Sequence, residues 1–267
     1  MKLTKENYFS SEADKFYMSV SQYNSFNGVP VKMKCEAMAM AKFKGEWVEE
    51  PTTPMLIGSY VDAYFDESLE DFKKEKPQIF TQKGELRAEF KKAEEIIQFA
   101  EQDSFFMDYI KGEGESQVIV TGEIGGCHWK GKIDRLHRGK AIVDLKVVAS
   151  IRDLIWIDYE KRKLNFIDAY GYINQGAVYQ ELYYQMSGER LPFYIAAITK
   201  EKVPDKEIFH INDEILQEAL KDIKINLPSV FKIKSKELPP VECGVCDYCK
   251  SVKKLEKTIL FVSDIYL

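Results

Sequence analysis

Two aspartates and a lysine in neighbouring strand-like segments are the strongest candidates for chemistry in this sequence. The run Gly131-Lys-Ile-Asp134 precedes a short connection, Arg138-Gly-Lys140, and the triplet Asp144-Leu-Lys146 follows it. If the connection is a three-residue hairpin loop whose central glycine takes a positive φ, Asp134 faces Asp144 across two antiparallel strands. Cross-strand neighbours have Cβ atoms about 5 Å apart, so these like charges need a cation between them. Hard carboxylate oxygens favour Mg²⁺ or Mn²⁺.

Lys146 lies two residues beyond Asp144, and strand alternation therefore places both on the same face. An ammonium group in that position can orient a water molecule or balance the charge of an attacked phosphate. Two other interpretations stay open. Asp144 and Lys146 can form a purely structural ion pair, and a two-residue turn at Arg138-Gly139 would place Asp134 on the opposite face.

A second hairpin, at Gly125-Gly126, pairs Gln117 with Asp134 and makes Gln117 a candidate substrate-binding residue. Glu123 points to the same face but lies about 20 Å along the strand, so it is not expected to be a ligand.

The cysteines form the other group with metal-ligand spacing. Cys243, Cys246 and Cys249 form a C-x-x-C-x-x-C array, and Cys35, far upstream, supplies a fourth thiol. Tetrahedral Zn²⁺ and iron–sulfur clusters both need four such ligands. Cys127 lies within a strand and is expected to be part of the core. Reduced cysteines without a metal remain the alternative.

Composition and charge set limits on the function. Of the 267 residues, 45% are hydrophobic, which fits a globular core, and no apolar run reaches the roughly 18 residues that span a bilayer. The charged start lacks the apolar core of a signal peptide, so a cytoplasmic protein without membrane association is expected. The net charge is −5, but residues 128–163 carry ten Lys and Arg against five acids, which leaves −10 elsewhere. This basic zone suits a polyanion, although a lysine-rich surface without a ligand also explains it.

The sequence gives no support for a nucleophilic hydrolase or for a nucleotide-binding enzyme. The three histidines are scattered, and no Gly-rich phosphate loop is present.

The elements that must position these residues follow the order helices, antiparallel meander, helix, strand, helix, which indicates an α/β core with a mixed sheet. Strands are expected at 117–124, 127–137, 141–148, 193–199 and 207–211. Helices are expected within 14–44 and at 55–69, 83–102, 150–158, 165–186 and 213–227, the last capped by Asp213. We expect one domain over residues 1–231, with a helical insertion or lid at 70–104. A C-terminal tail, 232–267, carries the cysteines and packs back on the core.

Together these residues resemble the PD-(D/E)XK exonucleases of the RecE (exodeoxyribonuclease VIII) and phage type, which are related to lambda exonuclease and RecB-like nucleases. The resemblance runs from about Ser19 to the C-terminus and is most specific around Asp134, at Asp144–Lys146 and at Gln175–Tyr179. It implies a restriction-endonuclease-like fold with a mixed central sheet flanked by helices. It also implies that Asp134 and Asp144 are the acidic metal ligands and that Lys146 is catalytic, and we expect the Leu145 carbonyl to complete the coordination.

The resemblance assigns two further positions. Gln175 and Tyr179 represent the family's Q-x-x-x-Y helix and lie one turn apart, where they can reach the DNA backbone. The pair Gln180 and Tyr184 is a second match, and a tyrosine packed on the sheet is the simpler alternative. The family usually has a metal-binding histidine four residues after a helical glycine, where this chain has Asp62. Asp62 offers an oxygen ligand, unless it belongs to a solvated polar stripe of its helix.

The resemblance implies Mg²⁺- or Mn²⁺-dependent hydrolysis of DNA, most simply as an exonuclease on duplex ends in phage or prophage recombination. A single-strand annealing protein is the implied partner, and a ring-shaped homo-oligomer the implied assembly. The alternatives are a RecB-like nuclease that trims DNA in CRISPR adaptation or repair, and a DNA-binding module whose carboxylates are structural.

Some RecB-like nucleases hold a [4Fe–4S] cluster with one N-terminal and three C-terminal cysteines. The resemblance therefore implies such a cluster at Cys35, Cys243, Cys246 and Cys249, with Zn²⁺ as the alternative.

Overall fold

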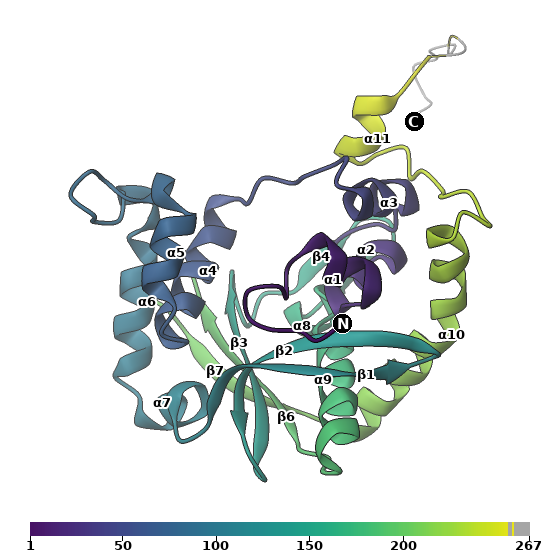
Figure 1. Cartoon of the computed structure of the whole chain (residues 1–267). Coiled ribbons are helices and arrows are strands. Elements are labelled where there is room, and N and C mark those ends of the chain that lie inside the picture. The colour runs from purple at the N-terminus through teal and green to yellow at the C-terminus, as the bar shows by residue number, and fades with distance from the viewer. Residues whose placement is uncertain (256–257, 259–267) are drawn as a thin grey trace.

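The computed structural model of the chain describes residues 1–255 and 258, and its centre is a five-stranded mixed sheet (Figure 1). The strands are β1 (Glu115–Ile124), β2 (Cys127–His137), β3 (Ala141–Val148), β6 (Phe193–Thr199) and β7 (Lys206–Ile211). They lie in the order β1-β2-β3-β6-β7, and only β3 and β6 are parallel. Helices flank the sheet, which confirms the predicted α/β fold.

Both predicted hairpin turns are present. Gly125 and Gly126 have φ angles of 60° and 76°, and Ile124 pairs directly with Cys127 across the two-residue turn. At the second turn Gly139 has a φ of 66°, and His137 pairs with Ala141. The second turn therefore has three residues, as predicted, and it fixes which side chains of β2 and β3 face each other.

One face of the sheet is covered by helices from the first half of the chain. They are α4 (Thr53–Phe65), α5 (Leu69–Glu75), α6 (Lys92–Glu101) and α7 (Ser104–Lys111), with the short 3-10 helices η1 (Pro77–Ile79) and η2 (Ala88–Phe90). Their apolar side chains pack against Val143, Leu145 and Ile198 of the sheet. The segment 70–104 therefore forms part of one layer of the domain, because its apolar side chains are buried against the sheet. Of the expected helix at 83–102, only the second half is α-helical.

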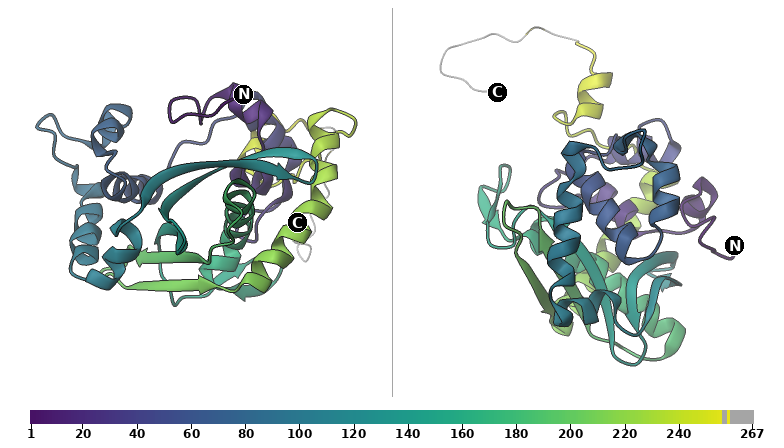
Figure 2. Two further views of the ribbon diagram at one scale, coloured as in Figure 1. Left: turned by 60° about the horizontal axis from the view of Figure 1, so that its bottom comes forward. Right: turned by 90° about the vertical axis from the view of Figure 1, so that its left-hand side faces the viewer.

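The other face packs on a second set of helices. They are α2 (Val20–Asn27), α3 (Glu36–Lys44), α8 (Phe166–Ala169), α9 (Tyr172–Ser187) and α10 (Asp213–Lys234). The short α1 (Ser11–Phe16) precedes α2 in the chain. Strands β1 and β2 arch over α9, as Figure 2 (left) shows, and α10 packs against α9. Within β3 the face alternates by residue, so Ile142 belongs to this core while Val143 belongs to the opposite one.

Four further local predictions were wrong. The single helix expected at 165–186 is divided into α8 and α9 at Gly171, which has a φ of 68°. The segment near 150–158 is not helical, since β4 (Ile155–Ile157) pairs with β5 (Arg162–Leu164) in a separate hairpin. Helix α10 continues to Lys234 through Pro228, because Val230 and Ile233 extend its buried stripe. Its N-cap is Asn212, whose side chain accepts a hydrogen bond from the Glu214 N–H.

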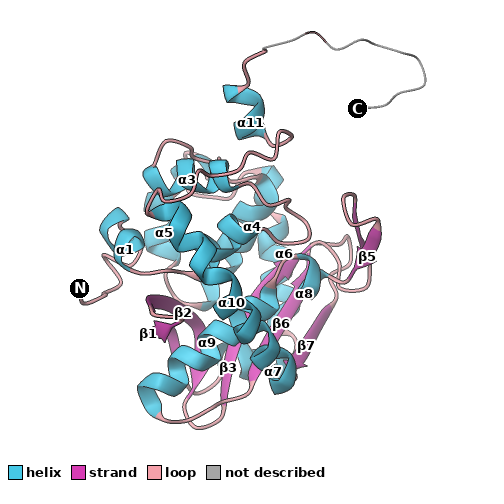
Figure 3. Cartoon of the chain, turned by 90° about the vertical axis from the view of Figure 1, so that its right-hand side faces the viewer, coloured by secondary structure: helices cyan, strands magenta, loops and turns pink. Residues whose placement is uncertain are grey.

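The C-terminal segment returns to α3. Helix α10 crosses the expected boundary at residue 231, and the chain then reaches α11 (Asp247–Val252), which lies beside α3 (Figure 3). The Ala37 N–H donates a backbone hydrogen bond to the Val241 carbonyl, and the Glu36 carboxylate accepts from the Val241 N–H at 3.0 Å. The end of the predicted tail, 256–257 and 259–267, lies outside the described residues. Over the part of the chain that is described, no helix has both the length and the apolarity needed to cross a membrane.

Candidate metal-dependent active site

The hairpin between β2 and β3 brings the two predicted aspartates together. Paired positions run from His137–Ala141 to Arg135–Val143, and the next residues along are Asp134 and Asp144. The ladder stops there, and the Leu145 N–H donates a 3.1 Å hydrogen bond to Asp134 Oδ2 in place of a strand-to-strand bond. Both carboxylates therefore lie where the two strands separate, with space between them that a closed ladder would not leave.

Asp134 is held in a buried and electrostatically unfavourable position. Burial raises the pKa of Asp134 well above its usual value, and the nearby charge of Asp144 raises it further. Besides the Leu145 N–H, its only hydrogen-bond donor within the described residues is the Gln117 amide, at 3.5 Å. Gln117 has a φ of 56°, an uncommon conformation for a residue with a side chain. The structure thus places Gln117 beside Asp134, as the hairpin register predicted.

Asp144 is almost completely buried, with 1% of its side chain exposed, and forms an ion pair with Lys146. Burial lowers the pKa of Lys146, but the charges of Asp144 and Asp134 outweigh burial and leave that pKa above its ordinary value. The Lys146 ammonium, which also lies 5.0 Å from the centre of the Tyr172 ring, therefore stays protonated. The arrangement leaves one cationic side chain among clustered carboxylates.

Helix α9 supplies the predicted amide and phenol. The Gln175 side-chain amide donates to Asp144 Oδ1 at 2.6 Å and lies 3.1 Å from the Tyr179 hydroxyl. Burial raises the pKa of Tyr179, so its hydroxyl keeps its proton. The competing pair is elsewhere: Gln180 is buried against Leu191 and Asp213. The structure therefore brings the Gln175–Tyr179 pair to the aspartates.

Asp62, from α4, reaches the same site from the other layer. Its Oδ1 is buried and has no hydrogen-bond partner within the described residues. Burial raises the pKa of Asp62 to about 7, the Lys146 charge opposes this rise, and the Asp144 charge adds to it. Asp62 is thus an inward-facing carboxylate, not part of a solvated stripe.

The donor set fits a hard divalent cation. A cavity of about 20 Å³ is lined by Asp62, Asp134, Gln117 and Leu145 among others, and one water or small ion needs about 10–15 Å³. An unpartnered buried carboxylate oxygen costs stability unless a cation satisfies it. Asp62, Asp134 and Asp144 supply the oxygen ligands that Mg²⁺ and Mn²⁺ prefer. Leu145 contacts this group through its N–H, while the role expected for its carbonyl stays a prediction.

The sequence interpretation missed part of the site. A hollow of about 420 Å³ adjoins Asp134, Gln175 and Tyr179 and is also lined by Lys130, Lys132 and the N-terminal residues Tyr8 and Phe9. The alternating residues Lys130, Lys132 and Asp134 in β2 were a signal for the lysines, because strand alternation places all three on one face. No pattern in the sequence pointed to the N-terminal segment.

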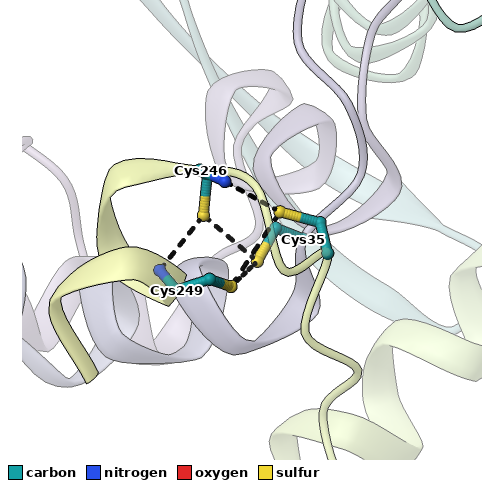
Figure 4. Close-up of side chains that lie close together, drawn as sticks. Cys35, Cys246 and Cys249 are labelled. Carbon is teal, nitrogen blue, oxygen red and sulfur yellow. Dashed lines mark hydrogen bonds between the residues drawn. The ribbon is translucent and has the colours of Figure 1, made fainter. Parts of the chain in front are cut away.

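The four predicted cysteines form a second centre, remote from the aspartates in the chain. Their sulfur atoms all lie within 4.8 Å of one another. Cys35 Sγ is 3.5 Å from Cys249 Sγ and 3.7 Å from Cys246 Sγ (Figure 4). Cys243 Sγ is 3.9 Å from Cys249 Sγ. Cys127 lies apart, in β2.

The backbone around the cysteine centre favours a thiolate at Cys243, whereas burial raises the pKa of Cys246 and of Cys249. Burial raises the pKa of Cys243, but backbone hydrogen bonds from Val245 and Cys246 outweigh it and lower that pKa to about 7. The N–H groups of Cys246 and Cys249 point at the sulfur atoms of Cys243 and Cys246, at 3.3 and 3.4 Å. Such a centre joins α3 to α11 and can hold one metal site between the chain ends.

Comparisons with known proteins agree with this architecture. Residues 19–252 match the model of a family described as a PDDEXK-like domain of unknown function (DUF3799). A crystal structure titled "Putative exonuclease", from Eubacterium rectale, is 51% identical, covers 97% of each chain and has a TM-score of 0.91. The structure of SSO0001 is 14% identical over 75% of this chain and 91% of that chain, with a TM-score of 0.29, too low to support an argument. No curated protein matches the chain.

Proposed function

The chain belongs to the DUF3799 family of PDDEXK-like domains, and from this premise we propose that it is a metal-dependent DNA nuclease. One observation carries the proposal: Asp62 and Asp134, from a helix and a strand, line one small cavity, and the neighbouring Asp144, whose charge raises the pKa of both, forms an ion pair with Lys146. A structural Asp–Lys pair does not require two further buried carboxylates, one of which has an unpartnered oxygen. Catalysis that depends on a divalent cation, in contrast, requires several such carboxylates as ligands.

In this proposal Asp62, Asp134 and Asp144 hold Mg²⁺ or Mn²⁺, with the Leu145 carbonyl as a further ligand. A bound cation activates water and stabilises the attacking and leaving oxygens of a phosphodiester. Lys146 orients the attacking water and balances charge on the phosphate. Gln175 fixes the rotamer of Asp144 through its 2.6 Å hydrogen bond, and Gln175 and Tyr179 also face the hollow where the substrate backbone would lie.

We further propose that the enzyme is an exonuclease that acts on duplex DNA ends in phage or prophage recombination. The support is the resemblance to RecE-type enzymes, together with a relative of 51% identity titled "Putative exonuclease". The proposal includes a single-strand annealing protein as partner and a ring-shaped homo-oligomer as assembly. Light scattering of the purified protein tests the oligomeric state. A gene for an annealing protein beside this gene would favour recombination over CRISPR adaptation or repair.

A cleavage assay titrated with Mg²⁺ or Mn²⁺ on linear, nicked and closed circular duplexes tests the activity. Digestion of linear but not closed circular DNA is expected. Asp134→Asn and Asp144→Asn should each reduce the rate by roughly 10³-fold or more, because each removes a charged ligand. Asp153→Asn, in an exposed loop, is the matched control. If both site variants cleave like the control, the protein is a DNA-binding module with structural carboxylates.

For the cysteine centre we propose a single tetrahedral ion, Zn²⁺, in preference to the [4Fe–4S] cluster expected from the resemblance. A Zn–S distance of about 2.3 Å puts the sulfur atoms of a tetrahedral site about 3.8 Å apart. Three of the sulfur–sulfur distances are 3.5, 3.7 and 3.9 Å, and all lie within 4.8 Å. A cubane cluster places four irons between the cysteines and would need these sulfurs to move apart.

Anaerobic purification followed by metal analysis and absorption spectroscopy distinguishes the two. Colourless protein with one zinc per chain supports the proposal, while brown protein that absorbs near 400 nm supports the cluster. Cys249→Ser should remove the metal and lower the melting temperature, because the site joins α3 to α11. Cys127→Ser is the control. Protein that binds neither metal after anaerobic purification has reduced, unliganded thiols.

A further inference from the structure

The hollow beside the aspartates combines aromatic rings with a cation and extends the site beyond the catalytic group. Its volume of about 420 Å³ lies in the range of pockets that take single small molecules, about 300–1,000 Å³. It is lined by Asp134, Gln175 and Tyr179, which belong to the group around the aspartates, and also by Tyr8, Phe9 and Lys132. A nucleotide fits such a space, whereas a double helix does not.

The two lysines of the hollow differ in what they contact. Lys130 is buried, with its ammonium 2.7 Å from the Asp14 carboxylate and hydrogen-bonded to the Tyr8 carbonyl. It therefore anchors the N-terminal segment against β2. Lys132 has no ion-pair partner within 4 Å in the described part of the chain, and its ammonium lies 5.7 and 4.7 Å from the ring centres of Tyr8 and Phe9. Of the two lysines of the hollow, Lys132 is therefore the one that is available to bind an anion.

Exposed aromatic rings line the same hollow. Phe9 is 74% exposed, so one surface of its ring is open to solvent. Tyr170 and Tyr172 also line the hollow and stack with ring centres 5.8 Å apart and planes at 18°, and Tyr170 is 42% exposed. Flat exposed rings around a cation are what proteins use to bind single-stranded nucleic acid, because bases stack on the rings while phosphates meet the cation.

We propose that this hollow binds the nucleotide next to the cleaved phosphate as a single strand, with its base stacked on Phe9 and its phosphate bound by Lys132. The inference rests on the proposed nuclease function and adds the strandedness of the substrate at the site. A duplex end must then separate before one strand reaches Asp134. The N-terminal segment, held by Lys130, forms one wall of the strand-binding site.

Binding of a fluorescein-labelled twelve-nucleotide single strand and of a blunt hairpin duplex, measured by anisotropy in Ca²⁺, tests the proposal. Phe9→Ala should weaken single-strand binding by roughly tenfold through loss of stacking. Lys132→Ala should lower the slope of log affinity against log salt by about 0.7, as expected when one phosphate contact is lost from a single strand. Lys132→Arg should restore that slope. Phe105→Ala, a remote ring that is 64% exposed, and Lys221→Ala, on α10, are the matched controls.

The outcomes separate this inference from the proposed function. If the wild type cleaves DNA but the Phe9 and Lys132 variants bind the single strand like their controls, the strand-binding role is wrong and the nuclease proposal stands. If the wild type binds neither probe and cleaves no DNA, both fail. Phe9 is exposed, so its variant should fold normally, and melting curves of both variants verify this.

Discussion

The amide nitrogen of Gln175, in α9, lies 2.6 Å from Oδ1 of Asp144, in the middle of the sheet. Asp144 is otherwise held by Lys146, so its carboxylate is fixed from two directions by residues 2 and 31 positions away in the chain. This bond links the helix to a carboxylate that we propose as a metal ligand, and it explains why a helix pattern and a strand pattern occur together in one site.

Gln175→Ala should weaken metal binding without removing the ligand itself. A hydrogen bond to a charged group contributes about 1.5–3 kcal/mol, and Asp144 would lose its only donor from α9. The Mg²⁺ concentration for half-maximal cleavage should rise about tenfold, and the melting temperature should fall by a few degrees. Gln102→Ala, on an exposed helix end, is the control. An unchanged Mg²⁺ requirement would mean that Gln175 acts only on DNA.

Lys146→Ala should reduce turnover by about 10²-fold while changing DNA affinity in Ca²⁺ less than threefold. It should also destabilise the metal-free protein by about 3–5 kcal/mol, because it leaves Asp144 charged and buried without its cation. Urea unfolding in EDTA and in Mg²⁺ measures this, and Mg²⁺ should recover part of the loss. Lys146→Arg, which keeps the charge, should retain stability. Equal losses of turnover and affinity would assign Lys146 to substrate binding.

Asp62→Asn should weaken metal binding without destabilising the fold. The substitution keeps the shape of the side chain but removes a buried charge whose Oδ1 has no partner in the described structure. The Mg²⁺ requirement should therefore rise at least tenfold, while the metal-free melting temperature should stay the same or increase. Isothermal titration with Mn²⁺ in the absence of DNA checks the first expectation. A variant with unaltered Mn²⁺ affinity would exclude Asp62 as a ligand.

Replacing each of two glycines near the site with alanine should change the stability of the protein in opposite directions. A Cβ on Gly131 would lie 2.9 Å from two ring atoms of Tyr179, so Gly131→Ala must displace that ring and should cost about 1–3 kcal/mol. A Cβ on Gly58, inside α4, meets Val147 at an ordinary 3.7 Å, so Gly58→Ala should stabilise the helix by up to about 1 kcal/mol. Urea unfolding of both variants tests the contrast. Destabilisation by Gly58→Ala would show that α4 lies closer to β3 than described.

The sequence by itself determined the parts of the site that depend on local rules. The turn residues Arg138-Gly139-Lys140 predicted a three-residue loop, and the structure confirms this loop and its register over the two-residue alternative. Strand alternation then placed Asp144 and Lys146 on one face, and helical spacing placed Gln175 and Tyr179 one turn apart. These relationships span few residues, so the backbone geometry of one element or one turn decides them.

Only the tertiary structure decided which distant segments complete the site. Asp62 joins the aspartates because α4 packs on the sheet, and Phe9 reaches Lys132 because Lys130 anchors the N-terminal segment. The hairpin of β4 and β5 and the continuation of α10 past Pro228 likewise depend on packing that overrides local preference. Burial, desolvation and pKa shifts arise from neighbours in space. They therefore cannot be read from spacing along the chain.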